Sequence, residues 1–257
     1  MFPYHDENAT QHPTYVTYAI IAVNVLVWLL IQGAGTTLRL AWSVCELGLI
    51  PGELTGSLPP GTPFPMGEGI VCLTDPGRQL STVITSMFLH GSWMHLLGNM
   101  WFLWIFGNNI EDSMGHARFT VFYLTCGVAA ALLQVAVSPA SRIPMVGASG
   151  AISGVMGAYL LLYPRVRVFT LVPIGFFLTS IALPAWTMLL YWAVLQMLGG
   201  FTGLMAEERG GVAFWAHIGG FVAGLALIKL FARSDYVSAH RGHHWRPRRV
   251  VGEHWRQ

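Results

Sequence analysis

Three short motifs place polar side chains within otherwise apolar sequence. They are HGSWMHLLGNM at residues 90–100, GASG at residues 147–150 and FWAHIGGFVAG at residues 214–224. Polar and ionisable groups inside membrane-spanning sequence are costly, which makes each of them a functional hypothesis. Together the motifs supply a hydroxyl, imidazoles and a carboxamide. These are the parts of an acyl-transfer site: a nucleophile, a base and neutral donors to an oxyanion.

Ser149 is the candidate nucleophile and His217 the candidate general base. The surroundings of Ser149 are not the G-x-S-x-G elbow of α/β-hydrolases, because position 151 is Ala151 and no strand is predicted before it. His217 shares a helix face with Gly220 and Gly224, which another helix can approach closely. The predicted spans hold no Asp or Glu to orient His217, so the expected mechanism is a Ser–His dyad.

The stretch that contains Ser149 also has a purely structural interpretation. Gly150, Gly154 and Gly157 fall at i, i+4 and i+7, which forms one smooth face for a second helix. A serine in such a packing helix is tolerated cheaply, because its hydroxyl can bond to the carbonyl one turn earlier. The local pattern alone does not decide between a packing serine and a nucleophile.

His95 and Asn99 are the candidate oxyanion donors. They are four residues apart and therefore share one helix face, and both can donate hydrogen bonds from their side chains. The alternative is a polar patch that satisfies a buried loop. His90 lies just before this helix, and we assign it that structural role.

The composition predicts a membrane protein. The chain has 257 residues, 54% hydrophobic and 10% charged, with a mean hydropathy of +0.54, whereas a soluble globular protein carries about 25% charged residues. We therefore expect an all-α membrane protein, a bundle of six transmembrane helices with a long extracytoplasmic loop between helices 1 and 2. That loop covers residues 33–79, and residues 165–175 are expected to form an interfacial connection. The expected spans are residues 15–32, 93–106, 119–137, 149–163, 184–198 and 212–231.

Charge placement predicts the boundaries and the orientation. We divide the chain into a short tail (1–14), a transmembrane domain (15–232) and a basic, His-rich cytoplasmic tail (233–257). The first segment lacks the Lys or Arg of a signal peptide. With both termini cytoplasmic, ten of the 14 Lys and Arg residues lie inside. The expected location is the plasma (cell inner) membrane. The net charge of +2 says little about nucleic acid, and no nucleic-acid partner is expected.

The chain contains three cysteines and no C-x-x-C pair, so neither a zinc site nor a thioredoxin-like site is expected. Cys45 and Cys72 both lie in the long loop on the expected outer side, where a disulfide can form. Two unpaired thiols at the membrane surface are the equal alternative. Cys126 lies within the third expected span and should stay free.

The three motifs taken together resemble the rhomboid family of intramembrane serine proteases. The pattern H-G-x-x-x-H-x-x-x-N is followed by G-A-S-G and by A-H-x-x-G in the last expected span. Gly107, Glu111 and Gly115 also match the G-x-x-x-E-x-x-x-G pattern of the family, and Glu111 is expected to be a structural polar residue. The resemblance covers about residues 15–232.

The resemblance implies a serine endopeptidase that hydrolyses peptide bonds of membrane-anchored helical substrates within the lipid bilayer, without cofactor or metal. It makes Ser149 the nucleophile and His217 the general base. His95, Asn99 and the backbone N–H groups of Ser149 and Ala148 would form the oxyanion hole.

Two positions depart from patterns found in the family. Many relatives carry Trp-Arg ahead of the second span where this chain has Ser81 and Thr82, and some have an aromatic residue at the position of Ser153. Two other functions stay open. One is a non-catalytic rhomboid-fold protein that binds transmembrane segments in membrane protein quality control. The other is a small transporter, for which the inverted repeats are missing.

Overall fold

The fold is mostly helical, with two small sheets at its edges. The computed structural model describes residues 2–66, 69–174, 177–205 and 213–238. Its α-helices are α1 (Tyr15–Leu26), α2 (Thr37–Leu47), α3 (Pro51–Thr55), α4 (Thr82–Thr85), α5 (Trp93–Met114), α6 (His116–Val137), α7 (Ser149–Leu162), α8 (Ala185–Met205) and α9 (Phe214–Phe231). The first helix continues into a π-helical turn (Val27–Ile31), and short 3₁₀ turns cover Gly33–Gly35 and Ser86–Phe88.

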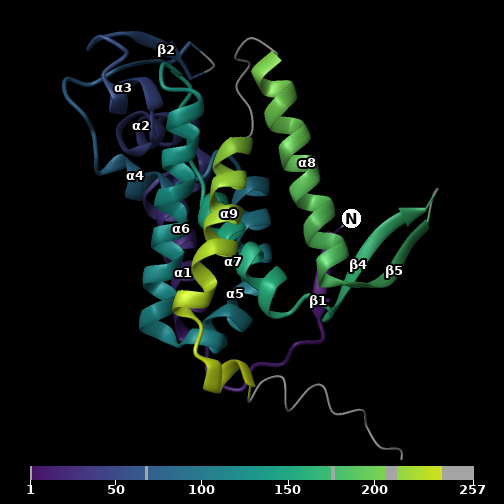
Figure 1. Ribbon diagram of the computed structural model, residues 1–257. Coiled ribbons are helices and arrows are strands. Elements are labelled where there is room, and N and C mark those ends of the chain that lie inside the picture. The colour runs from purple at the N-terminus through teal and green to yellow at the C-terminus, as the bar shows by residue number, and fades with distance from the viewer. Residues whose placement is uncertain (1, 67–68, 175–176, 206–212, 239–257) are drawn as a thin grey trace, which may run out of the picture.

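Helix α7 lies at the centre of the bundle and packs against α5, α6 and α9 (Figure 1). Every residue from Gly150 to Tyr159 is buried. A helix buried all round has no polar face, which explains why its sequence is apolar and rich in small residues. Ser149, its first residue, therefore stands at the end of a rigid and well-packed element.

Two glycines of α9 bring that helix against the backbone of α7. A Cβ atom at Gly220 would overlap the carbonyl of Gly150, and one at Gly224 would overlap the carbonyl of Gly154. This close approach is the one that small-residue faces permit in membranes. The expected packing of Gly220 and Gly224 therefore agrees with the structure.

The glycines of α7 serve two neighbouring helices. A Cβ atom at Gly157 would meet the carbonyl of Phe221 on α9. Those at Gly150 and Gly154 would meet Ala130 and Cys126 on α6 first, although the one at Gly154 would also lie 3.2 Å from the carbonyl oxygen of Gly220 on α9. The expectation of one face for one partner was thus too simple, because a central helix approaches neighbours on several sides.

The all-α expectation missed a three-stranded antiparallel sheet in the order β1-β4-β5. Strand β1 (Phe2–Asp6) pairs with β4 (Arg167–Ile174), which forms a hairpin with β5 (Phe177–Pro184) between α7 and α8 (Figure 1). The expected interfacial connection is therefore mostly a strand, and the N-terminal tail is part of the fold. Arg167 also holds Glu7 in an ion pair of 2.6 Å.

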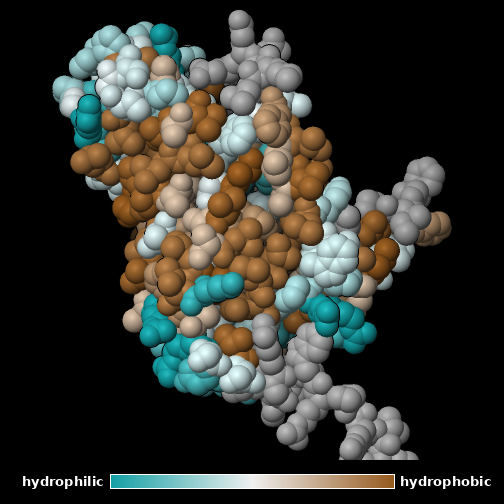
Figure 2. All heavy atoms as spheres, viewed as in Figure 1, coloured by the Kyte–Doolittle hydropathy of each residue, from teal (hydrophilic) through white to brown (hydrophobic). Residues whose placement is uncertain are grey.

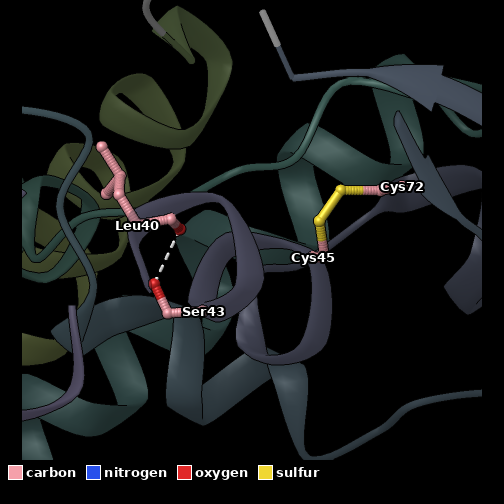
Figure 3. The surroundings of a disulfide bond; sticks show 4 residues. All are labelled: Leu40, Ser43, Cys45 and Cys72. Atoms are coloured by element: carbon pink, nitrogen blue, oxygen red, sulfur yellow. Dashed lines mark hydrogen bonds between the residues drawn. A yellow bond between two sulfur atoms is a disulfide. The ribbon is translucent and has the colours of Figure 1, made fainter. Parts of the chain in front are cut away.

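The long connection between α1 and α5 is ordered through several small elements. It contains α2, α3, α4 and a two-stranded sheet of β2 (Pro63–Pro65) and β3 (Val71–Leu73). A disulfide joins Cys45 on α2 to Cys72 on β3 (Figure 3), while Cys126 is free and buried. The disulfide thus links a helix of this connection to its sheet.

The face of the molecule seen in Figure 2 carries a broad apolar band. Figure 2 shows hydrophobic residues across the middle of the visible face, with hydrophilic residues gathered at the lower end and at the upper left. Among the described helices, α6 and α9 are long and apolar enough to cross a membrane, and residues 15–31 and 149–162 form shorter apolar helices. The remaining expected spans correspond to α5 and α8, which are longer than predicted at their C-terminal ends.

Candidate active site

Ser149 and His217 meet where the first turn of α7 faces the first turn of α9. The Nε2 atom of His217 lies 2.7 Å from the Oγ atom of Ser149. Both residues are partly buried. The glycine contacts described above bring the two helices this close, so local packing determines the distance between the hydroxyl and the imidazole.

His217 has a second hydrogen-bond partner that the sequence analysis missed. Its Nδ1 atom lies 2.7 Å from Oε1 of Gln196 on α8. The indole ring of Trp192, one turn earlier on α8, lies 5.8 Å from the imidazole between ring centroids. The available signal was Gln196 itself, a single carboxamide within the apolar run of α8, because an amide oxygen can accept from an imidazole as a carboxylate does.

These contacts explain how the His217 ring is held although position 153 is not aromatic. Ser153 is buried, and its hydroxyl donates to the carbonyl of Ser149 at 2.6 Å. Trp192 contacts the ring from α8 instead. The ring contact therefore comes from a neighbouring helix rather than from α7.

His95 and Asn99 lie beside the backbone that leads into Ser149. A Cβ atom at Gly147 would be 2.8 Å from Nε2 of His95 and 3.5 Å from Nδ2 of Asn99. Gly147 also has a φ of 127°, a conformation that favours glycine. Asn99 is 8% exposed, and its Nδ2 has no hydrogen-bond acceptor within the described chain. The amide of Asn99 is therefore a buried hydrogen-bond donor, close to Ser149, without an acceptor in the described chain.

His90 has a structural role next to the site. Its backbone N–H donates to Oε1 of Gln32 at 2.8 Å, and its carbonyl accepts from Nε2 of Gln32 at 2.9 Å. Its ring packs edge-on against His95, with 5.1 Å between centroids. Burial lowers the pKa of His90 to about 3, which keeps the ring neutral.

A cavity of about 780 Å³ surrounds these side chains. This volume lies within the usual range of ligand-binding pockets. Ala148, whose N–H was expected in the oxyanion hole, is fully buried directly before Ser149. The lining includes Ser149, His217, His95, Asn99, Gly147 and Trp215.

Glu111 lies at the other end of α5 and takes no part in this site. Its carboxylate accepts hydrogen bonds from the backbone N–H groups of Val16 and Thr17 at 2.9 and 2.7 Å, and from the Thr17 hydroxyl at 2.6 Å. It also contacts Nδ1 of His116 at 2.6 Å. Glu111 thus joins the start of α1 to α5 and α6, which is a structural role.

A family model described as the rhomboid domain matches residues 77–234. The match begins ahead of α4 and ends after α9, so it includes all three polar motifs.

Several curated proteins are similar to the chain. Rhomboid-like protease 5 of Toxoplasma gondii is 34% identical over 63% of this chain and 17% of its own length. Rhomboid protease GluP of Bacillus subtilis is 30% identical over 56% of the chain and 25% of its own length. Rhomboid protein 1, mitochondrial, of Saccharomyces cerevisiae is 28% identical over 56% of the chain and 40% of its own length. The chain thus spans less than half the length of these relatives.

Proposed function

The chain belongs to the rhomboid family, and from that premise we propose that it is an intramembrane serine endopeptidase. Its substrates would be membrane-anchored helical proteins, and its reacting groups would be Ser149 and His217. The observation that carries the proposal is the 2.7 Å contact between Oγ of Ser149 and Nε2 of His217 inside a cavity beside an unsatisfied amide donor.

The proposed reaction proceeds in two steps. As Oγ of Ser149 forms a bond to the scissile carbonyl carbon, its proton moves to Nε2 of His217. The peptide C–N bond then breaks, and the leaving amine takes that proton. A water molecule attacks the acyl carbon and gives a proton to Nε2, after which the C–Oγ bond breaks and Ser149 regains its proton.

The oxyanion formed in each step needs donors already in place. Asn99 and His95 are proposed for this role, together with the backbone N–H groups of Ala148 and Ser149. Their position next to Gly147 supports the assignment. Fixed donors in a site shielded from bulk water stabilise developing charge more than water does, because they need no reorganisation.

The proposed membrane arrangement has six spans, α1, α5, α6, α7, α8 and α9, with both termini cytoplasmic and the α1–α5 connection outside. The excess of Lys and Arg on the inner side supports it. We propose a cell inner membrane, and note that some relatives are named as mitochondrial or chloroplastic.

The test uses purified protein in lipid nanodiscs with a membrane-anchored reporter helix and a fluorophosphonate probe. The expected result is cleavage of the reporter and labelling of Ser149, both lost in Ser149→Ala. The matched control is Ser153→Ala, which removes a nearby hydroxyl that donates to the Ser149 carbonyl. Equal cleavage by Ser149→Ala and the unmodified chain would overturn the proposal. A folded chain with no cleavage and no labelling would favour the non-catalytic rhomboid-fold function.

A further inference from the structure

Helix α8 carries one carboxamide in an otherwise apolar sequence, and that side chain contacts the base. Gln196 is the only Asn, Gln or charged residue from Ala185 to Met205. The helix stands at the edge of the bundle beside α9 (Figure 1), and exposed apolar residues flank Gln196 on both sides. A primary amide on such a helix is costly unless it is hydrogen-bonded.

We infer that Gln196 is a positioning residue that makes the proposed dyad a Ser149–His217–Gln196 triad. The inference rests on the proposed function. Its basis is that both ring nitrogens of His217 are engaged at 2.7 Å, Nε2 by Ser149 and Nδ1 by Oε1 of Gln196. An amide oxygen only accepts hydrogen bonds, so Nδ1 must carry the proton.

This contact selects the tautomer that the reaction requires. With the proton on Nδ1, the lone pair of Nε2 is free to accept the proton of Ser149. In the other tautomer Nε2 carries a hydrogen and cannot act as the base. Gln196 thus does from α8 what a buried carboxylate does in a Ser–His–Asp triad, but without adding a charge to the membrane interior.

The position of Gln196 also restricts the ring in space. Trp192 is one turn earlier on the same helix and lies beside the imidazole, 5.8 Å between centroids. Ring orientation and proton position therefore both depend on α8, while Ser149 depends on α7. The site is complete only when these two helices flank α9 together.

Gln196→Met and Gln196→Glu test the inference in nanodiscs. Methionine keeps the length of the side chain but lacks the amide oxygen, so kcat should fall on the order of 10- to 100-fold, with little change in KM. Glutamate still accepts from Nδ1 and should restore most of the lost kcat. Leu195→Met is the control, because it introduces the same residue at the adjacent, exposed position of α8 without removing an amide.

A second measurement separates positioning from a structural role. ¹⁵N-histidine NMR should show His217 protonated at Nδ1 in the unmodified chain and a mixture of tautomers in Gln196→Met. An unchanged kcat together with an unchanged tautomer in Gln196→Met would overturn the inference. The proposed protease function would still stand in that case, provided that Ser149→Ala loses activity. A lower melting temperature with a normal kcat per folded molecule would also overturn it.

Discussion

Asn99 illustrates how a residue can be buried for a reason other than packing. Its amide lies against the backbone at Gly147, and Nδ2 has no acceptor within the described part of the chain. A buried donor without a partner costs free energy, on the order of 1–3 kcal/mol. A site that binds an oxyanion recovers this cost only when the reaction occurs, which fits the proposed role.

Replacing Asn99 by alanine should therefore act on the reaction. We expect kcat to fall by about 10²–10³-fold, the usual cost of removing one oxyanion donor, while KM changes little. Backbone donors remain, so the loss should be smaller than in Ser149→Ala. Steady-state kinetics and a melting curve of the variant in detergent distinguish the two roles. A variant with a lower melting temperature and a normal kcat would show that Asn99 has a structural role only.

Between α7 and α9, glycine determines whether the reacting groups meet. At Gly220 a single added carbon would overlap the carbonyl of Gly150, directly after Ser149. Interiors are close-packed, so such an overlap shifts whole helices rather than single atoms. The distance between Ser149 and His217 is therefore a property of the helix pair.

Gly220→Val should push α9 away from α7. We expect a lower melting temperature and a loss of fluorophosphonate labelling, because His217 then lies too far from Ser149 to take its proton. Gly98→Ala on α5 is the control for replacing a helical glycine, since nothing lies within 4 Å of its added Cβ position. If Gly220→Val labels at the rate of the control, the close packing has no role in assembling the site.

At the scale of the whole molecule, the segment just before α1 and the segment after α9 meet at the C-terminal end of α5. Asp112 accepts hydrogen bonds from the backbone N–H groups of Gln11 and His12 at 2.7 and 2.9 Å. The ring of His12 stacks on Tyr236, with 4.6 Å between centroids. These two segments therefore lie at the same end of the helix bundle, which supports the six-span arrangement proposed above.

This arrangement predicts the labelling pattern of the intact protein. In a Cys126→Ala background, Thr10→Cys and Ser238→Cys should react with a membrane-impermeant maleimide in inside-out vesicles only. Arg78→Cys, in the connection before α4, should react only from the other side. All three positions are exposed. Labelling of Thr10→Cys and Ser238→Cys from opposite sides would contradict the six-span arrangement.

The sequence by itself determined the helical class, the helix starts near Trp93 and Ser149, and the identity of Ser149, His217, His95 and Asn99 as candidates. These features are local. Apolar runs follow from hydropathy, and the glycine faces of α7 and α9 follow from spacing along one helix. Each can be found without knowledge of any neighbouring element.

Only the tertiary structure decided which residues complete the site. Gln196 and Trp192 carry no local pattern that directs them to His217, and the contact depends on how α8 stands beside α9. Strand β1 likewise pairs with β4 across more than 160 residues of chain, from Phe2↔Leu171 to Asp6↔Val168. The physical reason is that contacts between distant segments depend on where whole helices and strands lie. The periodicity of apolar residues reflects only the conformation of one local segment.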